Sequence, residues 1–166
     1  KPRCLLPGSI KFMSIFVDSS AFLAIIDAGD AQHQSAAEIW KTLIENEETL
    51  ICSSYVLIET MALIQHRLGM DALRQFQDDV YPLLHIIWIS EPEHRAGVDA
   101  LLRASRRRLS LVDCVSFEIM RSRGIRRVFC FDSHFSEQRF EAETGPVEAK
   151  TSVPDQTEDP SSESTR

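Results

Sequence analysis

The stretch SIFVDSSAFLAIID, residues 14–27, holds a short apolar run that ends in an acid, Asp18, and leads directly into apolar residues at helical spacing. A run of this length is too short for a helix and is typical of a buried strand. The segment after it repeats apolar residues at intervals of three and four and stops at Gly29. We therefore expect a strand followed directly by a helix, which is the unit from which parallel α/β sheets are built.

The same alternation of short apolar runs and amphipathic segments continues to residue 132. HIIWIS at 85–90 is rich in β-branched residues and predicts a buried strand, and RVFCFD at 127–132 predicts the last strand. We expect an α/β fold of three layers, α/β/α, around a central parallel sheet of four or five strands. The other predicted elements are a strand at 50–53 and helices at 33–45, 55–68, 71–84, 91–105 and 110–123.

The 166 residues, 43% of them apolar, are enough for one compact domain, which we expect at residues 14–140. Residues 1–13 lack the apolar core of a secretion signal, and we interpret them as an N-terminal extension. Residues 141–166 are rich in Pro, Ser, Thr and Glu and predict a disordered acidic tail. Because no apolar window is long enough to cross a bilayer, we expect a cytoplasmic protein with no membrane partner.

The four cysteines form no C-x-x-C pair. Cys52, Cys114 and Cys130 lie inside apolar runs, where a free thiol behaves as a small buried hydrophobe. We interpret them as reduced structural residues and not as a zinc site.

The net charge of -7 is unevenly distributed. Residues 141–166 carry seven acids and two bases, which leaves only -2 on the preceding 140 residues. Eight arginines gather between positions 103 and 127, and such a local positive field attracts phosphates. The alternative is that they are ordinary solvated helix ends. The eight are Arg103, Arg106, Arg107, Arg108, Arg121, Arg123, Arg126 and Arg127.

Two acids stand at the ends of predicted strands. Asp18 closes the first strand and Asp132 closes the last, and the carboxyl ends of parallel strands open into one crevice. An acid that ends an apolar run must be solvated, hydrogen-bonded or bound to a metal. The alternative for each is a helix N-cap.

Two further acids lie on predicted helices. Glu59 is surrounded by apolar residues in SSYVLIETMALIQHRL, so we expect a buried helix in which its carboxylate needs a proton, a partner or a metal; the alternative is an ion pair with Arg67. Asp113 follows Ser110 by three residues, which is also the spacing of a capping box.

Together, Asp18, Glu59, Asp113 and Asp132 offer the oxygen ligands that a hard divalent cation requires. A cation held there can activate water and stabilise charge on a phosphate, without a covalent nucleophile. The chain has no G-x-x-x-x-G-K-[ST], G-x-G-x-x-G, G-x-S-x-G or H-E-x-x-H motif, which argues against nucleotide-cradling, hydride-transfer, serine-hydrolase and zincin chemistry. We therefore predict a metal-dependent hydrolase of phosphodiester bonds.

Residues 14–140 resemble the PIN domain, and within that family the VapC-like toxins of bacterial toxin–antitoxin pairs. The resemblance rests on four segments in order: IFVDSSAFLAIID, SSYVLIET, LSLVDCVSFEIMRSRGI and VFCFDSHF, each of which contains one of the four acids. Two features depart from the family's pattern. Cys130 stands where such proteins often have Thr or Ser, and the acidic tail lies outside the usual domain.

The resemblance implies a ribonuclease with the four acids around Mg²⁺ or Mn²⁺, acting on RNA. It also implies supporting hydroxyls such as Ser19, frequent homodimerisation and a cognate antitoxin as partner. We add Ser110 and His134 as supporting residues, since His134 lies two residues after Asp132 and could reach substrate phosphate or a water. Arg106, Arg107 and Arg108 are the predicted RNA contacts.

Three alternatives can be compared with this prediction. A phosphatase of the haloacid-dehalogenase type requires a second acid two residues after the first, where this chain has Ser20. A response-regulator receiver requires a lysine near the last strand, and none is present there. The remaining alternative is a PIN-fold module that binds RNA or protein with little or no nuclease activity, against which the presence of all four acids argues.

Overall fold

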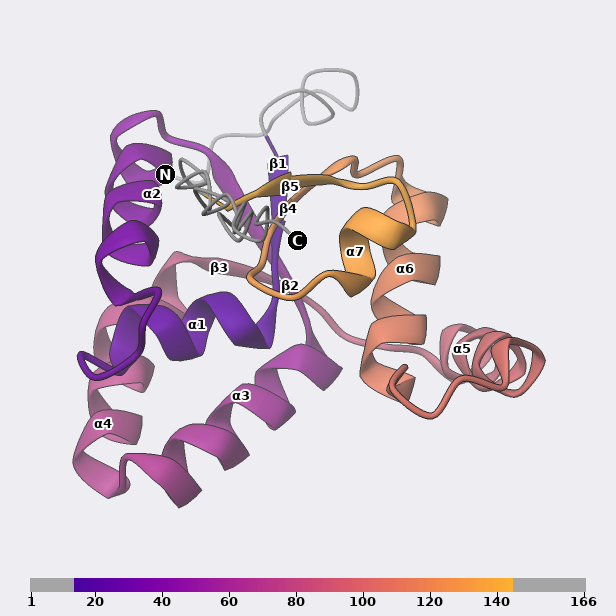
Figure 1. Ribbon diagram of the computed structural model, residues 1–166, viewed down its shortest axis with the longest axis horizontal. Helices are drawn as coiled ribbons and strands as arrows, with labels where there is room; N and C mark the ends of the chain where they lie inside the picture. The colour runs from indigo at the N-terminus through magenta and orange to yellow at the C-terminus, as the bar shows by residue number, and fades with distance from the viewer. Residues whose placement is uncertain (1–13, 145–166) are drawn as a thin grey trace, which may run out of the picture.

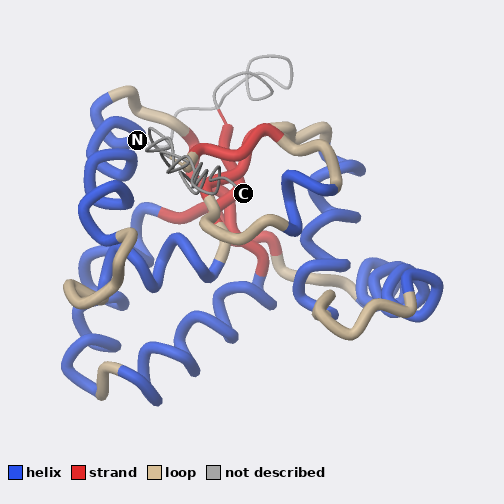
Figure 2. Tube along the Cα trace, viewed as in Figure 1, coloured by secondary structure: helices blue, strands red, loops and turns tan. Residues whose placement is uncertain are grey.

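The computed structural model describes residues 14–144, so the expectations for residues 1–13 and for 145–166 of the predicted tail lie outside the described residues. Five strands form one sheet in the order β3-β2-β1-β4-β5, and every pairing is parallel (Figures 1 and 2). The elements are β1 (Ser14–Val17), α1 (Ser19–Ile26), α2 (His33–Glu45), β2 (Thr49–Ser53), α3 (Ser54–Arg67), α4 (Met70–Gln75), a π-helical segment η2 (Phe76–Val80), a 3₁₀ turn η3 (Tyr81–Leu83), β3 (Leu84–Ile87), α5 (Glu91–Ala104), α6 (Leu111–Arg123), β4 (Arg127–Phe129), α7 (His134–Glu137) and β5 (Glu141–Glu143).

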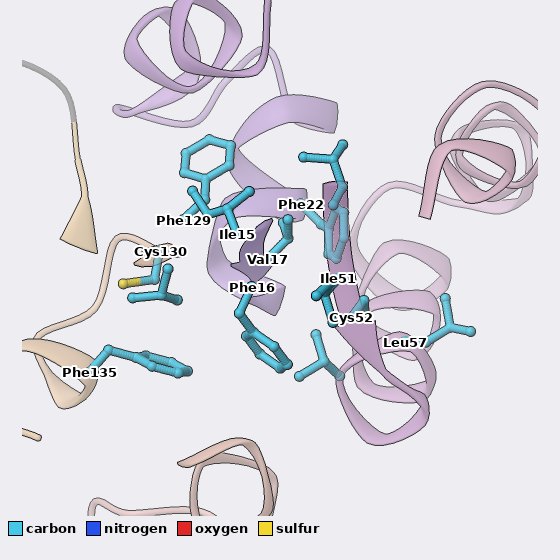
Figure 3. Packing of buried hydrophobic residues seen from close by; sticks show 14 of the residues in the cluster. Ile15, Phe16, Val17, Phe22, Ile51, Cys52, Leu57, Phe129, Cys130 and Phe135 are labelled. Atoms are coloured by element: carbon cyan, nitrogen blue, oxygen red, sulfur yellow. The ribbon is translucent and has the colours of Figure 1, made fainter. Parts of the chain in front are cut away.

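Strand β1 lies at the centre of the sheet and is buried on both faces. Helices α1 to α4 cover one face, and α6 and α7 cover the other, with α5 packed beside α6 (Figure 1). Alternate side chains of a strand point to opposite faces, and Phe16 accordingly packs 6.3 Å from Phe135 of α7, measured between ring centroids (Figure 3). On the opposite face, Phe22 of α1 packs against Trp40 and Phe76. The predicted three-layer α/β/α architecture is confirmed.

Local capping signals position the two helices that carry predicted acids. The Ser53 hydroxyl accepts a hydrogen bond from the Val56 N–H at 3.2 Å at the start of α3. Ser110 caps α6, which ends at Gly124 in the left-handed conformation at φ 67°. Ser is a preferred N-cap and Gly a preferred helix stop, so these residues fix where the two helices begin and where α6 ends.

The segment expected as one helix at 71–84 is divided into α4, η2 and η3. Pro82 lies in the last of these and has no N–H with which to continue an α-helical ladder. The strand predicted at 85–90 is present as β3, but the expectation that it is buried was wrong. Strand β3 ends at Ile87 and forms an edge of the sheet, His85 is exposed, and Trp88 after it is 68% exposed.

The last strand is β5, not the predicted strand at 127–132. Strand β4 ends at Phe129, and β5 pairs with it in parallel at residues that we had assigned to the tail. Arg127 joins this edge to the rest of the sheet, because its guanidinium contacts Glu143 at 3.1 Å and Glu48 at 2.7 Å. Strand β5 therefore depends on tertiary partners, and its sequence EAE has weak strand propensity by itself.

No helix of the described residues is long and apolar enough to cross a membrane.

Candidate metal centre

The crevice between β1 and β4 is the point where the strand order reverses direction. From β1 the chain proceeds outward through β2 and β3, and later returns to the other side of β1 as β4 and β5. Asp18 follows β1, and its N–H donates to the Phe129 carbonyl at the end of β4 at 3.0 Å. In open parallel sheets, ligands bind outside the carboxyl ends of the strands at such a reversal. Asp18 and Asp132 both lie at this edge, as predicted, although Asp132 follows the end of β4 by three residues and does not close the strand.

Asp18 is 3% exposed and caps α1. Its Oδ2 accepts the Ser20 N–H at 3.0 Å and the Ser20 hydroxyl at 2.7 Å. Burial raises the pKa of this carboxyl to about 6, the two bonds from Ser20 oppose the rise, and Asp132 adds to it by charge repulsion. Asp18 can therefore both cap α1 and bind a metal. Its Oδ2 accepts the capping bonds, and the buried carboxyl remains costly to ionise unless a cation is near.

The hydroxyl beside Asp18 belongs to Ser20 and not to Ser19, the residue we had expected. Ser20 Oγ also accepts the Phe131 N–H at 3.0 Å, so one hydroxyl joins the first turn of α1 to the loop after β4. An N-cap side chain accepts from residues two or three positions later, and that rule could have identified Ser20 from the sequence. The bond to Phe131 had no sequence signal, since the two residues are 111 positions apart.

Asp113 is held by the predicted capping box with Ser110. The Ser110 N–H donates to Asp113 Oδ2 at 2.8 Å, and the Asp113 N–H donates to Ser110 Oγ at 3.0 Å. The residue is only 9% exposed, and its Oδ2 lies 3.6 Å from Nδ1 of His134. The supporting role expected for Ser110 therefore takes the form of fixing the third acid in place.

Asp132 and His134 complete the cluster. Asp132 Oδ1 accepts the His134 N–H at 2.9 Å and lies 4.0 Å from Nδ1 of the same residue. Burial raises the pKa of the Asp132 carboxyl, and repulsion from Asp113 adds to the rise. One ligand atom from each of Asp113, Asp132 and His134 falls within 4.8 Å of the other two.

This donor set fits a divalent cation. Carboxylate oxygens suit Mg²⁺ and Mn²⁺. Asp132 is repelled by both Asp18 and Asp113, and a cation relieves repulsion between carboxylates. Asp113 and Asp132, with His134 beside them, are the residues that could hold it; Asp18 is buried near Asp132 but lies outside this group of converging ligand atoms.

Glu59 differs from the expectation. It lies half-buried on α3 and outside the group of converging ligand atoms. The prediction that α3 is buried all round was wrong, because Ile58 is 63% exposed and Arg67 at the end of the helix is exposed too. Only one face of α3 packs on the core, and apolar residues such as Ile58 lie on the exposed face. The spacing of apolar residues in the sequence did not distinguish these two faces.

The three predicted arginine contacts lie beside the cluster. Arg106, Arg107 and Arg108 follow α5 and line a hollow of about 640 Å³, which His134 also lines. Arg106 contacts Glu137 at 3.3 Å, an exposed pair that binds weakly. A positively charged hollow thus adjoins the acids.

The cysteines of the described chain are free and buried, as predicted. Burial and nearby Asp18 raise the thiol pKa of both Cys52 and Cys130, so neither supplies a thiolate. Cys130 Sγ lies 3.8 Å from the Asp132 carbonyl and packs behind the loop that carries this acid.

Comparison with known proteins gives concordant results. The family model described as PIN domain matches residues 15–141. Two relatives described as 23S rRNA-specific endonuclease VapC20, from the CDC 1551 and H37Rv strains of Mycobacterium tuberculosis, are each 31% identical over 127 residues, 76% of this chain and 95% of theirs. The crystal structure of M. tuberculosis VapC20, described as a sarcin-ricin loop cleaving toxin, matches with a TM-score of 0.70 and 30% identity over 80% of this chain and 99% of that one.

Proposed function

This chain belongs to the PIN-domain family, and from that membership we propose that it is an endoribonuclease, the toxin of a toxin–antitoxin pair, that hydrolyses RNA with Mg²⁺ or Mn²⁺. The observation that supports this most is the convergence of Asp113, Asp132 and His134 within 4.8 Å at the carboxyl edge of the sheet, with Asp18 beside them. We place the protein in the cytoplasm, where RNA is accessible.

Each residue has a definite part in this proposal. Asp18, Asp113 and Asp132 hold the cation, with Glu59 reaching in from α3. A bound cation supplies Lewis acidity, which lowers the pKa of water and stabilises negative charge on the phosphate. Ser20 and Ser110 keep two of the carboxylates in place through the bonds described above. Exclusion of bulk water by the buried wall around Asp18 strengthens these electrostatic interactions.

His134 and the neighbouring arginines contact the substrate in this proposal. The imidazole is 26% exposed, lines the 640 Å³ hollow and can donate to a phosphate oxygen. Arg106, Arg107 and Arg108 bind the backbone on the same side. Replacing the three arginines together weakens RNA binding and flattens its salt dependence, because each lost phosphate contact reduces the slope by about 0.7 for a single strand.

The toxin role also predicts protein partners. A cognate antitoxin would block the site, and we propose a homodimer as the working form of the enzyme. The antitoxin follows from the proposed toxin role and the homodimer from the resemblance to VapC-like toxins, and size measurement with and without a co-expressed candidate antitoxin tests both.

The experiment that tests the function uses purified protein and single-stranded RNA. Cleavage requires added Mg²⁺ or Mn²⁺, stops in chelator, and is lost in Asp18→Asn and Asp113→Asn. Calorimetric titration with Mn²⁺ gives an independent readout, since the variants also bind the metal more weakly. Normal cleavage in chelator would contradict the proposal.

The alternative is a PIN-fold RNA-binding module. It predicts that the Asp113→Asn variant binds RNA as the unaltered protein does and that neither cleaves it. The intact set of acids favours the enzyme.

A further inference from the structure

Besides Arg106, Arg107 and Arg108 beside the metal centre, the arginines from Arg121 to Arg139 fall into two groups in the structure. Some are neutralised by acids that fix them in place. Arg123 contacts Glu93 at 3.1 Å, and Arg127 lies between Glu48 and Glu143. These arginines brace α5 against α6 and join the strands, so they are not free to bind an anion.

A second group lines a hollow of about 450 Å³ that shares no lining residue with the one beside the metal centre. Its lining comes from the C-terminal end of α6, the residues just after it, and the segment that leads from α7 to β5. Arg121, Arg126 and Arg139 line it and are all exposed. Glu141 is the acid of the lining, so positive charge predominates there.

Arg121 is held in place by two aromatic rings. Its guanidinium lies 5.9 Å from the ring centroid of Phe117 and 5.7 Å from that of Phe140, a position favoured by cation–π attraction. Its contact with Glu118 at 3.4 Å joins two partly exposed side chains and stabilises little. The planar fork of a guanidinium matches two phosphate oxygens, and the aromatic rings reduce the entropy lost when it binds.

One side chain connects the two hollows. Gln138 lines the hollow beside the metal centre, and its Oε1 accepts a hydrogen bond at 2.5 Å from Arg121, which lines the other. The two hollows are therefore neighbours on the surface.

From this arrangement we propose that the hollow of Arg121, Arg126 and Arg139 is a second binding site for the RNA backbone, occupied by phosphates a few nucleotides away from the bond that is cut. The inference rests on the proposed ribonuclease function and adds a feature to it: affinity for RNA depends on substrate length beyond the cleaved bond. The site recognises phosphate charge and carries no base specificity.

The test measures RNA binding in chelator, so that no cleavage takes place. The probes are an oligouridylate of about 4 nucleotides and one of about 16 nucleotides, which bracket the common site sizes for single strands. For Arg126→Gln with Arg139→Gln, affinity for the long probe falls roughly tenfold at low salt and the salt slope decreases by about 1.4, since two phosphate contacts are lost. The short probe binds unchanged.

The control removes the same charge elsewhere. Arg67→Gln with Arg74→Gln takes two exposed arginines from the ends of α3 and α4, away from both hollows, and leaves the salt slope for the long probe close to that of the unaltered protein (Figure 1). A melt of each double variant verifies folding.

Three results would overturn the inference. These are an equal loss for short and long probes, an equal loss in the control variant, and an equal loss of binding to polyglutamate, which would assign the hollow to acidic protein. None of them bears on cleavage, which the aspartate variants test separately. Conversely, an inactive protein whose long-probe binding still depends on Arg126 and Arg139 would contradict the proposed enzyme and leave this site in place.

Discussion

Helices α6 and α3 are both rich in apolar residues and each carries a predicted site acid, but they hold that acid in different ways. In α6 the acid is Asp113, in the first turn, fixed by the two bonds of the capping box and 9% exposed. In α3 it is Glu59, in the second turn, half-buried and outside the converging group. In α6 the capping box and nearly complete burial both restrict the Asp113 side chain. Glu59 has no capping box and is only half-buried, so its side chain is less restricted.

The difference shows that a helix positions a short acid near its N-terminus better than a long one in its middle. Asp113 has two side-chain torsions, and the Ser110 N–H restrains them before any metal binds. Glu59 has a third torsion, and its ordering must be supplied when a ligand arrives. We therefore expect the two acids to contribute unequally to the same reaction, and four predictions test this comparison.

The largest expected effect is on cleavage. Asp113→Asn lowers the rate by at least about 10³-fold, because a fixed charged ligand is lost, whereas Glu59→Gln lowers it by roughly tenfold. Initial rates on one RNA substrate with saturating Mg²⁺ measure both. Equal losses in the two variants would mean that Glu59 is as well ordered in the working enzyme as Asp113, and the comparison would fail.

The next effect concerns Asp18, the most buried acid of the site. Its pKa of about 6 in the folded chain exceeds the ordinary value of 3.8, so between these values the folded state binds more protons than the unfolded state. The free energy of unfolding of metal-free protein therefore falls as pH rises through this window, by up to about 3 kcal/mol. Denaturant melts in chelator at several pH values measure it.

The Asp18→Asn variant is the control for that dependence. The amide oxygen can still accept from Ser20 but does not titrate, so most of the fall with pH disappears. Asp132, whose pKa is raised too, leaves a smaller slope of the same sign. An unchanged slope in the variant would place the titration on another residue.

A smaller effect tests the capping box directly. Ser110→Ala lowers the free energy of unfolding by about 1 kcal/mol, as loss of an N-cap usually does, and Ser110→Thr restores most of it. The lost bond runs from the Asp113 N–H to Ser110 Oγ and fixes the backbone that carries this acid, so cleavage in the Ala variant falls as well. Full activity with lowered stability would mean that the box serves the helix alone.

The smallest effect is expected at the other helix. Glu59→Gln changes the free energy of unfolding of metal-free protein by no more than about 0.5 kcal/mol, because a half-exposed carboxylate has little desolvation to recover. Thermal melts in chelator compare it with the unaltered protein. A large rise in melting temperature would instead indicate that the Glu59 carboxylate is buried, as the sequence had suggested.

Local signals in the sequence predicted much of the fold. The helix at 33–45 has its predicted bounds, and the capping box of Ser110 and Asp113 forms at the spacing that predicted it. Each of these features is encoded within a few residues, by periodicity or by a capping side chain. The position of Asp18 at the sheet edge followed from the same reasoning.

The features that were missed depend on distant contacts. Strand β5 exists through its pairing with β4 and through Arg127, and Glu59 is partly exposed because one face of α3 is not covered by the elements of residues 14–144. The closeness of His134 to Asp113 could not be predicted either, because it depends on how α7 packs beside α6. Propensity and spacing carry no information on such pairs.

The bond from Phe131 to Ser20 spans 111 positions, and it has a consequence for protein synthesis. During synthesis Asp18 emerges from the ribosome early, whereas Asp113 and Asp132 emerge only after most of the domain. Until then β1 has no β4 to pair with, and the first acid lacks the others. The growing chain therefore cannot assemble its metal centre, and the capacity to cut RNA arises in one step near the end of translation.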